Sequence, residues 1–84
     1  MNTISWSKRA IKQLRKIDKV SAIRITKAVA GLVDFSTLNN VKSLTNHQYD
    51  YRLKVGNYRV MFNNDDHVQI VLIEEVKKRD ERTY

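Results

Sequence analysis

Apolar residues in the first half of the chain recur with the period of an α-helix. Around residues 10–17 they fall on one helical face, between basic side chains: Ala10, Ile11, Leu14 and Ile17. Ser7 precedes this segment and has a side chain suited to an N-cap. The pattern therefore predicts an amphipathic helix with a strongly basic outer face.

A second helix is predicted directly after the first. Its apolar stripe comprises Ala22, Ile25, Val29 and Leu32. Asp18 or Ser21 can cap it, and because neither Gly nor Pro separates the two segments, we expect a tight helical hairpin. Residues 34–43 contain side chains that disfavour a long helix, so we expect a connection there.

The second half of the chain changes to the period of a β-strand. Within residues 49–55, apolar and aromatic positions alternate with charged ones: Tyr49, Tyr51, Leu53 and Val55 against Asp50, Arg52 and Lys54. Residues 58–62 alternate in the same way. The intervening Gly56-Asn57 predicts a two-residue hairpin turn of type II′.

Two further strands complete the predicted sheet. Residues 67–75 are apolar nearly throughout, which favours a strand in the middle of the sheet, and residues 63–66 form the predicted turn before it. Residues 3–6 predict a short first strand. The order β-α-α-β-β-β indicates an α+β fold, with two N-terminal helices packed on one face of a small, mainly antiparallel sheet. A length of 84 residues fits a single domain, residues 1–84.

Composition and charge narrow the class of protein. Cysteine is absent, which excludes disulfides and Cys-based zinc sites, and no apolar run approaches the ~18 residues of a membrane span. The N-terminus lacks the pattern of a secretory signal, so we expect a cytoplasmic protein. The formal net charge of +7 predicts an anionic partner, which could be nucleic acid, an anionic membrane or an acidic protein.

The predicted hairpin concentrates positive charge on one face of the sheet. Lys54 should lie opposite Arg59, with Arg52 two residues away on the same face. Because directly opposed like charges are destabilising, this is either a solvated face or an anion site where phosphate oxygens offset the repulsion. Arg79 follows the last strand and could reach the same face. Tyr84 could stack on a base, although a frayed terminus is the simpler interpretation.

Three other polar residues carry weaker expectations. His47 precedes the hairpin and is a candidate acid or base, but a surface loop histidine is the simpler interpretation. Glu74 and Glu75 are neighbours in a predicted strand, so they should point to opposite faces and cannot act together. No metal-binding motif and no Gly-rich phosphate loop is present in the sequence.

Together these features resemble the RelE/ParE superfamily of bacterial toxins from type II toxin–antitoxin systems. The resemblance covers nearly the whole chain and rests on the element order, the length and the segment YRLKVGNYRV at residues 51–60. The closing VKKR at residues 76–79 and the later Tyr84 also fit. The resemblance implies a RelE-like fold.

The resemblance to the RelE branch of this superfamily implies a specific chemistry. It implies an mRNA endonuclease of the ribosomal A site, in which the ribose 2′-OH attacks the neighbouring phosphate without a metal or cofactor. Carried over by position, Lys54 is the candidate general base and Arg52 a phosphate contact. Arg59 would stabilise the charged phosphorane, Arg79 would protonate the leaving 5′-oxygen, and Tyr84 would stack on a displaced base.

The same resemblance implies partners and leaves two other functions open. The expected partners are the ribosome, its mRNA and a cognate antitoxin protein whose acidic, apolar segment wraps the domain; no membrane partner is expected. One alternative is a ParE-like inhibitor of DNA gyrase without nuclease activity, which induced DNA breakage with intact mRNA would identify. The other is a plain RNA-binding module, whose binding should survive Lys54→Ala with only a reduced salt dependence.

Overall fold

The computed structural model describes residues 1–79, so the predicted role of Tyr84 falls outside the described residues. The elements in chain order are β1 (Thr3–Trp6), α1 (Lys8–Arg15), α2 (Lys19–Ala30), the 3-10 segment η1 (Gly31–Thr37), β2 (Val41–Ser43), β3 (Tyr51–Val55), β4 (Tyr58–Asp65) and β5 (Ile70–Lys78).

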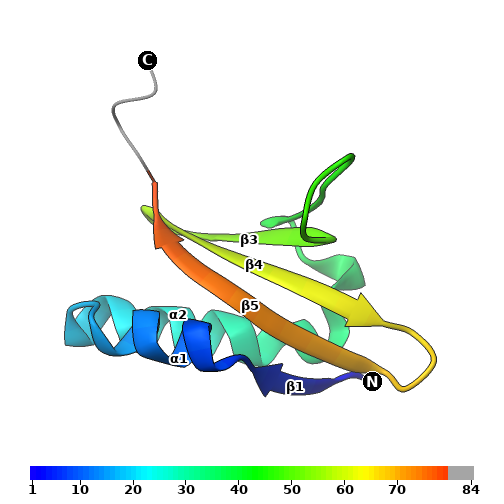
Figure 1. Ribbon diagram of the computed structural model, residues 1–84, viewed down its shortest axis with the longest axis horizontal. Coiled ribbons are helices and arrows are strands. Elements are labelled where there is room, and N and C mark those ends of the chain that lie inside the picture. Colours follow the sequence, from blue (N-terminus) through cyan, green and yellow to red (C-terminus); the bar gives the residue numbers. More distant parts are fainter. Residues whose placement is uncertain (80–84) are drawn as a thin grey trace.

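The strands form one five-stranded sheet in the order β1-β5-β4-β3-β2. β1 is parallel to β5, and the other neighbouring pairs are antiparallel. Both helices lie along one face of the sheet (Figure 1). The predicted α+β class and the mainly antiparallel sheet are therefore confirmed, and the opposite face of the sheet, which we call the open face, is left without a helix.

Both predicted helix starts are confirmed by hydrogen bonds. The Ser7 hydroxyl accepts from the Ala10 backbone N–H at 3.0 Å and donates to the Glu74 carbonyl at 2.9 Å, so it joins α1 to β5. Asp18, rather than Ser21, caps α2, because its carboxylate accepts from the Ser21 N–H at 3.0 Å. This bond lowers the pKa of Asp18.

The core lies between the helices and the sheet, and Phe62 of β4 is its largest fully buried side chain. The Phe62 ring stacks on Tyr51 of β3 with centroids 5.3 Å apart and meets Phe35 of η1 edge-on, also at 5.3 Å. These offset and edge-on contacts suit the charge distribution of aromatic rings. Three residues of the stripe predicted for the second helix complete this core: Ile25 and Val29 of α2 and Leu32 of η1 are buried, whereas Ala22 is only partly buried.

Three boundary predictions are wrong, including that of the last strand, which was predicted at residues 67–75 and is found at Ile70–Lys78. Residues 34–43 are not only a connection, because Val41–Ser43 forms the edge strand β2, in which Val41 pairs with Leu53 and packs against the core. Residues 63–66 are not the turn, because β4 continues to Asp65 and pairs with a strand that begins at Ile70. Pairing with a neighbouring strand makes residues 41–43 a strand and lengthens β4, and a local sequence pattern does not show such pairing.

No helix in the described range 1–79 is long and apolar enough to cross a membrane.

Candidate functional site

A row of three cations crosses the open face near the tip of the β3–β4 hairpin. In the strand register, Lys54 of β3 lies opposite Arg59 of β4, and Arg59 lies opposite Lys77 of β5. The first pair confirms the geometry expected from the Gly56-Asn57 turn, where Gly56 has φ 56°. Side chains directly opposite each other have Cβ atoms about 4.5–5.5 Å apart. The positive charge of Arg59 is therefore repelled by both of its cross-strand neighbours, Lys54 and Lys77.

A second row runs beside the first, two residues along the strands. Lys42 of β2 pairs with Arg52, Arg52 pairs with Met61, and Met61 pairs with Glu75. Met61 is only 3% exposed and forms an apolar floor between the charged side chains. The two rows together define the cationic cluster: Lys42, Arg52, Lys54, Arg59 and Lys77.

Sequence reasoning missed two members of the cationic cluster, Lys42 and Lys77. Lys42 belongs to the edge strand that was expected to be a connection, and only its pairing with Arg52 brings it to the site. Lys77 lies beyond the predicted end of the last strand. The alternation of apolar Val76 with polar Lys77 was the available signal, because it continues the strand period.

The remaining predicted residues occupy different positions. Arg79 is exposed and follows β5 directly, and its backbone N–H donates to the Asn57 carbonyl at 2.6 Å. This bond holds the end of β5 against the hairpin turn, next to the cationic cluster. His47 is exposed in the loop before β3, and its Nδ1 accepts from the Tyr49 N–H at 3.1 Å.

A β-bulge corrects the expectation for the two glutamates. The register of β4 with β5 shifts between Met61 and Phe62, whose partners are Glu75 and Ile73, so Glu74 is the extra residue. A bulge changes the alternation of side chains locally. Glu75 shares a row with Met61, while the Glu74 carboxylate accepts from Asn63 Nδ2 at 3.1 Å. Both carboxylates therefore lie near the open face, beside the cationic cluster.

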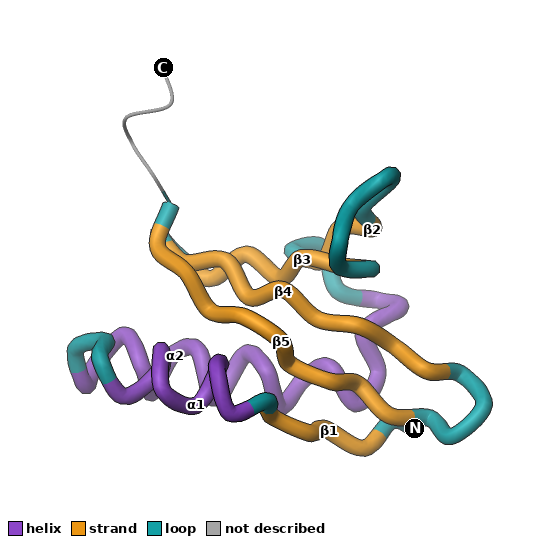
Figure 2. The backbone as a smooth tube through the Cα atoms, viewed as in Figure 1, coloured by secondary structure: helices purple, strands orange, loops and turns teal. Residues whose placement is uncertain are grey.

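Tyr49 also departs from its predicted place. It was expected to face the same way as Tyr51, but it precedes β3, is 6% exposed and stands outside the main core cluster. Its hydroxyl accepts from Gln48 Nε2 at 3.2 Å and from Arg9 of α1 at 3.4 Å. The loop before β3 thereby leaves the sheet and rises over the open face (Figure 2).

Burial raises the pKa of Tyr49 above its usual value of 10.0, and a hydrogen bond to Glu75 and the charge of that carboxylate add to the effect. The neutral phenol is thus favoured by folding, so its contribution to stability is present below pH ~10 and is lost as pH rises through the raised pKa. We expect Tyr49→Phe to flatten the alkaline fall in unfolding free energy. At pH 7 it should cost about 0.5–1.5 kcal/mol through lost hydrogen bonds.

Urea unfolding between pH 7 and pH 11 measures both effects. Plotted against pH, the unfolding free energies of the wild type and of Tyr49→Phe should run parallel up to about pH 9 and converge above it. The reason is that only the wild-type chain has a phenol to ionise at this position. Curves that stay parallel throughout would contradict the buried-phenol assignment.

The geometry suits a reaction in which negative charge develops on phosphate oxygens. Arg52 and Arg59 are half-buried and carry planar guanidinium groups that suit phosphate, and Lys54 adds a third charge beside them. Carboxylates near the open face add proton-accepting groups. Among residues 1–79, no group of three or more His, Asp or Glu side chains is placed to bind a metal ion.

Both the sequence and the fold are similar to those of known proteins. The family described as "ParE toxin of type II toxin-antitoxin system, parDE" matches residues 4–83 of the chain. No curated protein is similar enough to the sequence to count as a match.

Solved structures with the same fold come from bacteria and archaea. The isolated RelE toxin of E. coli aligns with a TM-score of 0.82 at 18% identity, over 99% of this chain and 89% of that one. The RelBE2 toxin–antitoxin complex of Mycobacterium tuberculosis gives a TM-score of 0.78 at 21% identity, over 93% and 98% of the two chains. The RelE–RelB complex of Pyrococcus horikoshii gives 0.76 at 20% identity, over 95% and 97%. These identities establish a common fold.

Proposed function

The chain belongs to the ParE toxin family of type II toxin–antitoxin systems, and from this premise we propose that it is a metal-independent endoribonuclease that cleaves mRNA in the ribosomal A site. The observation that carries the proposal is the row of Lys54, Arg59 and Lys77. A fold that keeps three like charges in line loses stability unless an anion offsets the repulsion. RNA phosphate is the polyanion that such a toxin would meet on the ribosome.

The proposed reaction is a transfer of the phosphoryl group to the ribose 2′-oxygen. The 2′-oxygen bonds to phosphorus while its proton passes to a base, for which Lys54 is the candidate. The P–O5′ bond breaks, which leaves a cyclic phosphate on one fragment and a 5′-hydroxyl on the other. Arg59 and Arg52 stabilise the charge on the non-bridging oxygens, and preorganised cations commonly lower the barrier of such reactions more than any other group. Arg79 is the candidate proton donor to the leaving 5′-oxygen.

The structure adds a second candidate for the base. Glu75 lies in the row of Arg52 and Met61. Two residues further along β5, on the same face, Lys77 belongs to the cationic cluster. A carboxylate accepts a proton without first losing one, so Glu75 can assist or replace Lys54.

We also propose a cognate antitoxin as partner. The solved complexes of similar fold contain a RelB chain beside the RelE toxin, and a charge of +7 favours an acidic partner. An acidic segment laid over the cationic cluster would neutralise it and exclude mRNA.

Mapping of 5′ ends on ribosome-bound mRNA tests the proposed activity. Within minutes of induced expression, new 5′-hydroxyl ends should accumulate inside coding sequences, while uninduced cells serve as the control. The ends should be absent from mRNA that is not being translated, because the A site presents the substrate. Growth arrest with intact messages would reject the proposal.

The family match also supports a second candidate function, the poisoning of DNA gyrase by a ParE-like toxin. This function needs no phosphodiester chemistry on RNA. It predicts double-strand DNA breaks after induction while mRNA stays intact, so the same cultures distinguish the two candidates. The cations at Arg52, Lys54 and Arg59 favour the endoribonuclease.

A further inference from the structure

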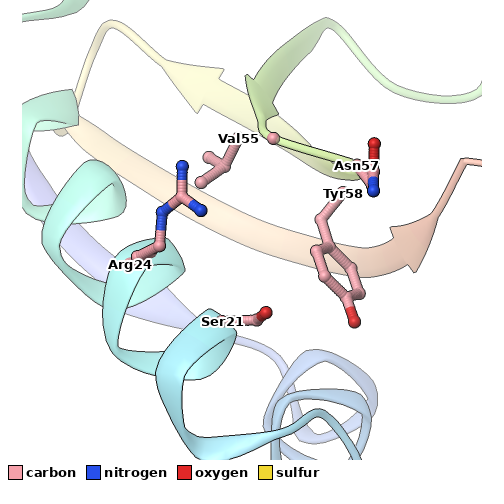
Figure 3. Close-up of a pocket in the computed structure, with 6 residues that line it drawn as sticks. Ser21, Arg24, Val55, Asn57 and Tyr58 are labelled. Atoms are coloured by element: carbon pink, nitrogen blue, oxygen red, sulfur yellow. The ribbon is translucent and has the colours of Figure 1, made fainter.

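The tip of the β3–β4 hairpin borders a hollow on its helix side, opposite the open face. The hollow has a volume of about 140 Å³ and lies between the Gly56-Asn57 turn and α2 (Figure 3). Since a water molecule takes up about 30 Å³, a phosphate-sized group has room there. The lining residues are Ser21, Arg24, Val55, Gly56, Asn57 and Tyr58.

Arg24 supplies the binding group of this hollow. It is exposed on α2, and in Figure 3 its side chain extends toward Val55 and the turn. Within residues 1–79, no hydrogen-bond or ion-pair partner occupies its guanidinium. This group carries five N–H donors in a planar fork that matches phosphate oxygens in two places.

Gly56 keeps the space in front of Arg24 open. A Cβ at this position would lie 3.9 and 4.0 Å from the two terminal guanidinium nitrogens, so a longer side chain would enter the hollow. The φ of +56° at this residue also disfavours any side chain. The turn chemistry and the open hollow thus depend on the same glycine.

Within the described part of the chain, the charges around the hollow are mainly positive. Lys78 pairs with Tyr58 across β4 and β5, which places it on the helix side. The acidic neighbour is Asp18, whose carboxylate already caps α2 through the Ser21 N–H at 3.0 Å. Hydrogen bonds from Ser21, and to a smaller extent the charge of Lys78, lower the pKa of Asp18. Among residues 1–79, Arg24 and Lys78 therefore outweigh the one neighbouring carboxylate, which is already hydrogen-bonded.

We propose that this hollow binds a backbone phosphate of single-stranded RNA, so that the RNA passes round the hairpin tip from the cationic cluster to Arg24. The choice of RNA rests on the proposed function. The two-residue turn separates Lys54 and Arg59 on the open face from Arg24 on the helix side. A flexible polyanion can contact both surfaces, because only one layer of sheet lies between them.

The test measures binding of a 2′-O-methyl RNA oligonucleotide, which lacks the attacking hydroxyl and stays intact. Fluorescence anisotropy over a range of salt concentrations gives the slope of log K against log salt. One lost phosphate contact on a single strand reduces that slope by about 0.7. We expect this reduction for Arg24→Ala. Arg24→Lys should keep most of the slope because the charge remains. Lys27→Ala, on the same exposed helix but outside the hollow, should match the wild type.

An Arg24→Ala slope equal to that of the wild type or of Lys27→Ala would overturn the proposal. If the same variant also binds a poly-glutamate peptide more weakly, the hollow is assigned to an acidic protein partner instead. The oligonucleotide cannot be cleaved, so this binding test does not depend on catalysis. If the protein leaves mRNA intact but binds the oligonucleotide through Arg24, the nuclease function is rejected and the site at Arg24 is retained.

Discussion

Replacing Arg59 with alanine should reduce mRNA cleavage by about 10²–10³-fold, the usual cost of removing one group that stabilises developing charge. Arg59 is the central cation of its row, with Lys54 and Lys77 on either side. Single-turnover cleavage of mRNA on programmed ribosomes measures the effect. Removing the central charge also relieves two repulsive cross-strand contacts, each worth about 0.2–1 kcal/mol. The variant should therefore unfold at the wild-type temperature or above it.

Lys27→Ala is the matched control for this experiment, because it removes one positive charge from an exposed position on α2. It should remain toxic and cleave mRNA at the wild-type rate. Equal losses in the two variants would mean that net charge, rather than the position of Arg59, governs activity. Full cleavage by Arg59→Ala would remove this residue from the proposed chemistry. A large fall in thermal stability would show instead that Arg59 has a structural role.

Phe62→Ala should destabilise the fold by about 3–5 kcal/mol, because it removes a fully buried ring and leaves a cavity. Phe62 contacts the rings of both Phe35 and Tyr51, so it joins β4 to η1 and to β3. Small domains are stable by only about 5–15 kcal/mol in total. At about 4–8 °C per kcal/mol, the midpoint of thermal unfolding should fall by at least ~12 °C.

Val20→Ala provides the comparison for this core substitution. Val20 is 69% exposed on α2, so truncating it should change the unfolding free energy by no more than about 0.5 kcal/mol. Calorimetry of both variants under the same conditions gives the two shifts. A Phe62→Ala protein that unfolds within a few degrees of Val20→Ala would contradict the described core.

Local chemistry explains the parts of the fold that could be predicted. Ser7 and Asp18 cap helices through hydrogen bonds to N–H groups three residues away, so neighbouring sequence is sufficient to indicate both starts. Gly56-Asn57 fixes the hairpin register in the same way, because a two-residue turn leaves one pairing for Lys54 and Arg59.

The errors share one physical origin, which is contact between residues far apart in the chain. β2 is a strand because Val41 pairs with Leu53 of β3. β4 continues to Asp65 because Asp65 pairs with Ile70 of β5. Tyr49 lies outside β3, and its hydroxyl accepts from Arg9, which is forty residues earlier in the chain. Periodicity within a segment contains no information about such partners.

The sequence by itself determined the α+β class, the helical hairpin and the opposition of Lys54 to Arg59, since each follows from caps, period or turn type. Only the tertiary structure decided what surrounds those two cations. Pairing of β2 and β5 with the hairpin adds Lys42 and Lys77 and places Glu75 opposite Met61, while the bulge beside Met61 brings Glu74 near the same face. Packing of α2 beneath the turn creates the hollow at Arg24. Bulges, edge pairing and helix–sheet packing are settled by the free energy of the whole fold, so no local pattern could have placed these groups.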